Sequence, residues 1–226
     1  KSDGTYADIA DWLYSTCIND AVTSISWRYD YHDWSRNPVD PGGSIDLKWI
    51  PDTVIRFDIA DLEMDGTLET AELPRGMVIL NVAGNRLTGT LSTEHLPPSV
   101  LHVSVARNML SGSLVLTKLP PLVERFDASR NAFSGSVDLT KLPPSMTQLC
   151  LHKNQFFGSI DFTKLPRSLK ELNLSTNPFE GVSDFSLLPS SLRELNVQGT
   201  NLSGFLVQAP GDNFSVIGSK VKVLKE

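Results

Sequence analysis

Apolar and polar residues recur along this chain with a period of 23 residues. Proline, glycine and asparagine each return at one fixed slot of that period. A period of this length predicts a stack of similar structural units, each of which contacts only its neighbours. The residues in register are Pro51, Pro74, Pro97, Pro120, Pro143, Pro166 and Pro189; Gly43, Gly66, Gly89, Gly112, Gly135, Gly158, Gly181 and Gly204; and Asn85, Asn108, Asn131, Asn154 and Asn177.

Each unit is predicted to hold one short strand and a return segment without an α-helix. Apolar residues alternate over the first half of the unit, as at Leu172 and Leu174, which is the period of a strand with one buried face. A Leu-Pro step such as Leu165-Pro166 disfavours a helix in the second half, and 23 residues leave little room for one. We therefore expect 3₁₀ or extended segments opposite the strands.

The recurring asparagines and glycines have predicted structural roles. An Asn side chain can bond to backbone groups of its own turn and of the adjacent unit, so stacked asparagines would form a ladder. The recurring glycine would supply a backbone conformation or a close approach that a Cβ would hinder. The predicted ladder consists of Asn85, Asn108, Asn131, Asn154 and Asn177.

The repeat resembles that of the leucine-rich-repeat family. The unit from Ser168 to Ser190 reads SLKELNLSTNPFEGVSDFSLLPS, and the general pattern is LxxLxLxxNxFxGxIDxxxLPx, which extends over roughly residues 40–206. The part from Asn to Gly-x-Ile resembles the plant-type subclass. The LPxSL ending and the segments VDLTKLP and IDFTKLP resemble repeats of kinetoplastid protists, which we favour. The resemblance implies an α/β-type repeat solenoid, a right-handed coil with a parallel β-sheet on the concave face and 3₁₀ or extended segments on the convex face.

Residues 1–50 are predicted to be an N-terminal cap with a helix, an aromatic strand and a first degenerate repeat. We expect the aromatic residues to cover the first regular repeat; the alternative is a site on which a ligand stacks. Apolar residues at helical spacing are Ile9, Trp12 and Leu13, and the alternating aromatic residues are Trp27, Tyr29 and Tyr31.

The regular repeats are predicted over residues 51–206 and a C-terminal cap over residues 207–226. In the second of these, Val221 and Val223 alternate with Lys220 and Lys222. Lysines on an outer strand oppose the addition of a further strand, which is what a cap requires.

Composition and charge narrow the classes of partner. The chain has 226 residues and a net charge of −6, and a basic excess typical of nucleic-acid binding is absent. No apolar run approaches the roughly 18 residues that a membrane-spanning helix needs. We expect no cofactor and a monomer.

The compartment stays open at this stage. Cys17 and Cys150 lie several predicted units apart, so a bridge between them is not expected, and unpaired thiols favour a reducing compartment. Three N-x-S sequons at Asn173, Asn201 and Asn213 point to a secreted or surface form instead.

Strand residues that do not point into the core are predicted to face the concave surface and to bind a partner. Arg107, Arg130 and Lys153 share one slot in three successive units and would form a basic row. Such a row is either screened by solvent or contacts an acidic protein or peptide. The candidate partner-binding residues are His102, Arg107, Arg125, Asp127, Arg130, Gln148, His152, Lys153 and Glu171.

Two other kinds of site are weighed. Residues Asp61 to Glu72 imitate a calcium loop, but Gly66 is already required by the repeat and no helices flank the loop, so we expect no metal site. Cys150 and His152 share a strand face, which is the minimum for a thiolate–imidazole pair.

The sequence therefore predicts a non-enzymatic module that binds a protein or peptide on its concave face. The alternatives are a structural or surface-coat repeat protein and, more remotely, an enzyme built on Cys150.

Overall fold

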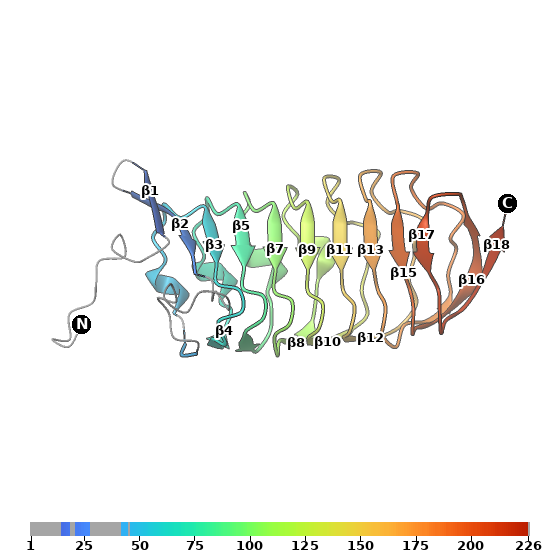
Figure 1. Cartoon of the computed structure of the whole chain (residues 1–226), viewed down its shortest axis with the longest axis horizontal. Coiled ribbons are helices and arrows are strands. Elements are labelled where there is room, and N and C mark those ends of the chain that lie inside the picture. Colours follow the sequence, from blue (N-terminus) through green and yellow to red (C-terminus); the bar gives the residue numbers. More distant parts are fainter. Residues whose placement is uncertain (1–14, 19–20, 28–41, 45, 226) are drawn as a thin grey trace.

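The computed structural model describes residues 15–18, 21–27, 42–44 and 46–225 and shows a solenoid whose strands lie side by side along its long axis (Figure 1). The main sheet has 10 strands in the order β1-β2-β3-β5-β7-β9-β11-β13-β15-β17. Strand β1 is antiparallel to β2, and the other neighbouring pairs are parallel. The strands are β1 (Ser15–Ile18), β2 (Ala21–Ser26), β3 (Arg56–Asp58), β5 (Ile79–Asn81), β7 (His102–Ser104), β9 (Arg125–Asp127), β11 (Gln148–Cys150), β13 (Glu171–Asn173), β15 (Glu194–Asn196) and β17 (Asn213–Ser215).

The return segments form short strands and 3₁₀ helices, and the described residues contain no α-helix. The short strands form parallel sheets β4-β6, β8-β10-β12 and β14-β16-β18. The predicted fold class, a leucine-rich-repeat solenoid with a parallel sheet and 3₁₀ or extended return segments, is thereby confirmed. The elements are β4 (Asp65–Thr67), β6 (Arg86–Thr88), β8 (Ser111–Ser113), β10 (Ala132–Gly135), β12 (Gln155–Phe156), β14 (Glu180–Val182), β16 (Asn201–Gln208), β18 (Lys220–Lys225), η3 (Leu47–Trp49), η4 (Thr70–Glu72), η5 (Thr93–His95) and η6 (Leu116–Lys118).

The core is a continuous apolar column between the main sheet and the return segments. The alternating residues that the period assigned to the core, such as Leu172 and Leu174, are fully buried. Phe133, Phe156 and Phe179 stack one above the other, with ring centroids 6.3 and 6.2 Å apart. No single unit could bury these side chains, so the stack is held together by contacts between units.

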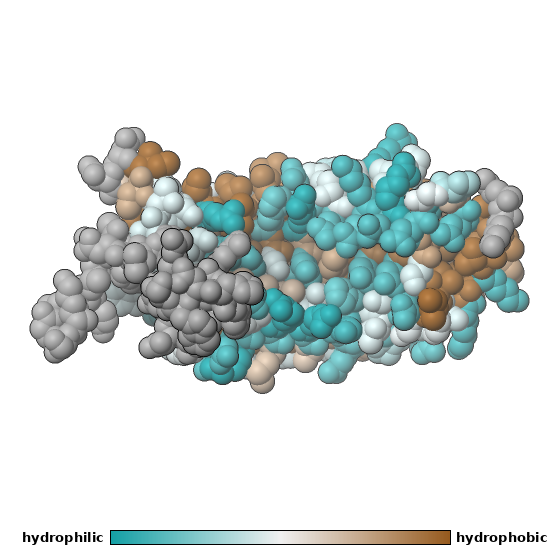
Figure 2. All heavy atoms as spheres, viewed as in Figure 1, coloured by the Kyte–Doolittle hydropathy of each residue, from teal (hydrophilic) through white to brown (hydrophobic). Residues whose placement is uncertain are grey.

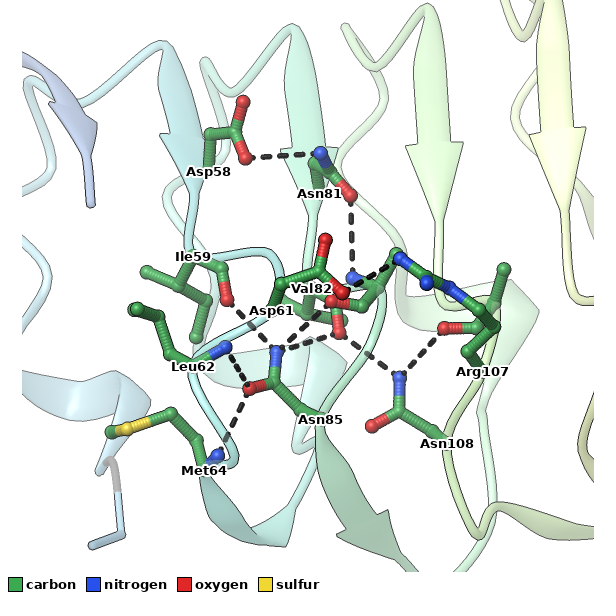
Figure 3. Close-up of polar contacts among 12 residues, drawn as sticks. Asp58, Ile59, Asp61, Leu62, Met64, Asn81, Val82, Asn85, Arg107 and Asn108 are labelled. Carbon is green, nitrogen blue, oxygen red and sulfur yellow. Dashed lines mark hydrogen bonds and ion pairs between the residues drawn. The ribbon is translucent and has the colours of Figure 1, made fainter. Parts of the chain in front are cut away.

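Asparagine side chains connect the backbones of successive units at the bend that follows each main-sheet strand (Figure 3). The amide of Asn85 donates to the carbonyls of Ile59 (2.8 Å) and Val82 (2.9 Å), and its oxygen accepts from the N–H groups of Leu62 (3.2 Å) and Met64 (2.9 Å). Similar bonds are made by Asn108, Asn131, Asn154 and Asn177.

The ladder changes residue type at its C-terminal end. Thr200 occupies the next slot, where its hydroxyl donates to the carbonyl of Val197 at 2.8 Å. A second ladder that we did not predict lies in the bend before the strands: the hydroxyls of Ser145, Ser168 and Ser191 donate to carbonyls of the preceding unit.

Both ends of the solenoid extend the sheets beyond the regular repeats. Strand β2 lies within the predicted N-terminal cap and pairs with β3, and β17 and β18 continue the two sheets through the predicted C-terminal cap. Trp27 packs against the core but lies after β2, outside a strand. The predicted helix at Ile9, Trp12 and Leu13, and the strand positions Tyr29 and Tyr31, lie outside the described residues.

A row of aspartates on the return segments predicts a dependence of stability on pH. The carboxylate of Asp161 accepts from the hydroxyl of Thr163 (2.6 Å) and from its N–H (2.8 Å), and these two bonds hold the pKa of Asp161 below its ordinary value. Asp138 and Asp184 make equivalent bonds, and the pKa of each is also lowered.

A depressed carboxyl pKa in the folded state contributes stability above the ordinary carboxyl pKa, and this contribution is lost as the pH falls through the folded pKa. In Thr163→Val we expect the Asp161 titration, followed by NMR, to move up toward the ordinary value. An unchanged midpoint would contradict this, and Asp138, whose partner Thr140 is retained, is the internal control.

Candidate binding surface on the main sheet

A shallow hollow of about 290 Å³ lies on the exposed face of the main sheet, which we call the concave face. It extends over β3, β5, β7, β9 and β11, and one cross-strand row of side chains runs through its middle. That row is Arg56, Ile79, His102, Arg125 and Gln148.

The structure divides the predicted partner-binding residues into two groups. His102, Arg125, Asp127 and Gln148 line the hollow, and Glu171 follows in the same cross-strand row on β13. The others, Arg107, Arg130, His152 and Lys153, lie in the bends after the strands, along the edge of the same face.

The basic row lies at a backbone position that disfavours ordinary side chains. Arg107, Arg130 and Lys153 have φ values of 54°, 55° and 55°, in the left-handed region. The same slot holds Gly84 (φ 69°) and Gly199 (φ 64°) in other units. A residue with a Cβ costs about 1 kcal/mol in this conformation, which glycine adopts freely. Three long cations therefore occupy a slot where glycine would be less strained.

Arg130→Gly is consequently expected to raise the free energy of unfolding, by about 0.5 kcal/mol, since relief of strain exceeds the added entropy of the unfolded chain. Urea unfolding of the two proteins measures the difference. Arg125→Gly is the matched control, because residue 125 has ordinary strand geometry and the change should lower stability by about 0.5–1 kcal/mol. A loss of stability in Arg130→Gly as large as in the control would contradict the argument.

Arg107 is held by a carboxylate two units away (Figure 3). Its guanidinium lies 2.7 Å from the carboxylate of Asp61, and the pair passes over Gly84 in the intervening unit. A Cβ on residue 84 would collide with the Asp61 carboxylate, so glycine is needed there for the pair to form. Because both side chains are about half exposed, the pair adds little stability. It does fix the direction of Arg107.

The two remaining cations of the row are exposed and unpaired. Within the described part of the chain, neither Arg130 nor Lys153 has a carboxylate within ion-pair distance. Arg125, in the adjoining hollow, is likewise exposed without an ion pair among those residues. Positive charge is therefore concentrated over β9 and β11.

Other charges in the hollow are satisfied internally. His102 lies 3.5 Å from Glu124, and Arg56 lies 3.0 Å from Asp58. The carboxylate of Asp127 accepts from the N–H of Ser129 at 2.9 Å, which stabilises the bend after β9. Asp127 thus has a structural bond in addition to its place in the hollow.

The geometry around Cys150 does not favour nucleophilic chemistry. The residue is only 4% exposed, and its thiol donates to the Glu171 carboxylate at 3.4 Å. Burial, followed by the charges of Asp127 and Glu171, raises the pKa of the Cys150 thiol far above its ordinary value. Burial also lowers the pKa of His152, whose Nδ1 is buried without a hydrogen-bond partner. A neutral thiol and a neutral imidazole are not an activated pair.

The carboxylates of the calcium-like segment are bound by arginines. Arg86 pairs with Glu63 at 3.1 Å and with Asp65 at 3.0 Å, and Asp61 pairs with Arg107. Among the described residues, no cluster of histidine, cysteine, aspartate or glutamate has the arrangement of a metal site. The two cysteines are free and lie on β1 and β11, five strands apart in the sheet order.

Comparison with known proteins finds similarity in structure. The Arabidopsis receptor kinase HAESA, in complex with the peptide hormone IDA and the co-receptor SERK1, superposes with a TM-score of 0.62 at 21% identity over 81% of this chain. The leucine-rich-repeat ectodomain of GASSHO1/SCHENGEN3 from Arabidopsis thaliana, in complex with CASPARIAN STRIP INTEGRITY FACTOR 2, gives 0.58 at 22% identity over 73%. The chain has the leucine-rich-repeat fold.

Coverage and sequence set the extent of this similarity. The chain spans only 36% of the HAESA structure and 21% of the GASSHO1 structure. Pollen Receptor Kinase 3 is matched over 97% of this chain and 85% of its own, with a TM-score of 0.56 and 18% identity. No family model and no curated protein sequence matches the chain. Within the described residues, no helix is long and apolar enough to cross a membrane.

Proposed function

We propose that this chain is a non-enzymatic recognition module that binds a protein or peptide on its concave face, with acidic groups of the partner over β9 and β11. Arg130 and Lys153 carry the proposal: two exposed cations without an ion pair among the described residues, held where glycine would be less strained. Backbone strain that is retained without an internal benefit points to a role in function.

Several further observations support the proposal. Arg125 adds a third exposed cation beside the row, and the hollow gives a partner a concave surface. Two of the similar structures contain a bound peptide or protein factor, and their titles name these ligands for receptor ectodomains much longer than this chain. The buried Cys150 thiol gives no support to the enzyme alternative.

The test replaces Arg107, Arg130 and Lys153 together by Ser. Peptides are first selected for binding to the wild-type chain from a random displayed library, and their affinities are then measured for both proteins. Loss of three partly exposed charge contacts should weaken binding roughly tenfold or more, and binding should become less sensitive to salt. Folding should be retained, because the three side chains point to solvent.

A matched control is available on the return segments. Lys118, Lys141 and Lys164 are also exposed and also lie 23 residues apart, so replacing them by Ser changes the net charge by the same amount. Selected peptides that lose affinity in this control, and not in the concave-face variant, would overturn the proposal. Unchanged affinity in both would point to the structural or coat alternative.

Three finer points belong to the same proposal. The partner surface is acidic, the chain acts as a monomer, and its repeats are of the kinetoplastid type rather than the plant type. The last rests on the LPxSL endings and the segments VDLTKLP and IDFTKLP of the sequence.

A further inference from the structure

The concave face has two edges of different chemistry. Along the edge where the strands begin, Ile55, Val78 and Leu101 occupy one slot of three successive units. Ile55 is 48% exposed, and the other two are half-buried. Figure 2 shows hydrophobic residues gathered along this upper edge over β3 to β7, and hydrophilic residues over the middle of the solenoid. We call these three residues the apolar edge.

The opposite edge, where the strands end, carries the basic row. Six residues separate Ile55 from Asp61, the first member of the slot that holds Arg107, Arg130 and Lys153. At about 3.3 Å per extended residue, the two edges lie roughly 20 Å apart. Ile79 lies between them in the hollow, beside His102 and Arg125. A ligand along the axis therefore meets apolar side chains on one flank and cations on the other.

We infer that the partner contributes an extended segment in which apolar and acidic residues alternate; this inference rests on the proposed function. In an extended chain, successive side chains point to opposite sides. One set would lie along the apolar edge and Ile79, and the other would reach Arg125, Arg130 and Lys153. Alternate side chains are about 6.6 Å apart and the strands beneath about 4.8 Å apart, a difference that long flexible cations accommodate.

The size of the hollow favours an extended segment over a helix. One turn of α-helix with its side chains, about 11 Å wide and 5.4 Å long, fills roughly 500 Å³. The hollow provides about 290 Å³. An extended segment needs only its alternate side chains to enter, so it can lie on this face without displacing the strands.

The inference is tested with two synthetic peptides of the same composition, acetylated and amidated at the ends. In one, Val and Glu alternate; in the other, the Val residues form one block and the Glu residues another. Fluorescence anisotropy measures their affinity for the wild-type chain at low salt. The alternating peptide should bind about tenfold more tightly than the block isomer, because only it places both residue types on their own edges.

A variant of the apolar edge separates this inference from the proposed function. Thr147 occupies the slot of Ile55, Val78 and Leu101 in a later unit, so replacing those three by Thr should leave the fold intact, which the thermal midpoint checks. We expect this variant to lose the preference for the alternating peptide, and the Arg107, Arg130 and Lys153 to Ser variant to lose affinity for both peptides. Equal affinity of the two isomers for the wild-type chain, no binding on the order of 1 mM, or an edge variant with full preference would overturn the inference. The library experiment would still decide the proposed function.

Discussion

Replacing Asn154 by Ala is expected to lower the free energy of unfolding by about 3 kcal/mol. The Asn154 oxygen accepts from the N–H of Phe133 at 3.0 Å, and its amide donates to the carbonyls of Ala128 and Leu151, each at 3.0 Å. Alanine leaves these buried backbone groups without partners, and each unsatisfied group costs about 1–3 kcal/mol unless water reaches it.

Urea unfolding measures the loss, and the thermal midpoint should fall by roughly 6–12 °C, at 2–4 °C per kcal/mol for a chain of this size. Gln155→Ala is the control: residue 155 is adjacent in sequence but exposed, so its loss should change stability by less than about 0.5 kcal/mol. Equal effects at the two positions would mean that the ladder does not stabilise the stack.

Phe156→Ala is expected to cost about 3–5 kcal/mol, the largest effect of any single substitution considered. The ring is fully buried and stacks between Phe133 and Phe179, in the two neighbouring units. Truncation leaves a cavity at two interfaces between units at once, and a solenoid is held together mainly by such interfaces.

The adjacent residue again provides the control. Phe157 is 54% exposed, and Phe157→Ala should change stability by less than about 0.5 kcal/mol. Chemical denaturation of both variants tests the difference. A loss below about 1 kcal/mol in Phe156→Ala would show that the units tolerate a gap in the core, contrary to the packing described.

The period of the sequence was sufficient to predict the architecture. A fixed slot for Leu172 and Leu174 determines which face of each strand is buried, and a fixed slot for Asn gives every unit the same bend. These are local, repeated constraints, so one unit read correctly gives the others. The end strands β2, β17 and β18 depart from the repeat pattern, and pairing with their neighbours determines them instead.

The candidate surface was only partly predictable. The period placed Arg107, Arg130 and Lys153 in one row, but the ion pair of Arg107 with Asp61 joins residues two units apart and depends on the missing side chain of Gly84. The left-handed backbone did leave a signal, because Gly84 and Gly199 occupy the slot of these cations. The burial of Cys150, by contrast, depends on its neighbours on β9 and β13, which spacing along one strand cannot reveal.

The most direct test of the central claim is to map where a library-selected peptide binds. The 24.8 kDa chain is labelled for NMR, and backbone shifts are followed during titration with the peptide. The account predicts that the largest shift changes occur at Arg125, Arg130, Gln148 and Lys153, on and beside β9 and β11. Changes confined to the return segments around Lys118, Lys141 and Lys164, or to the sheet β14-β16-β18, would contradict it.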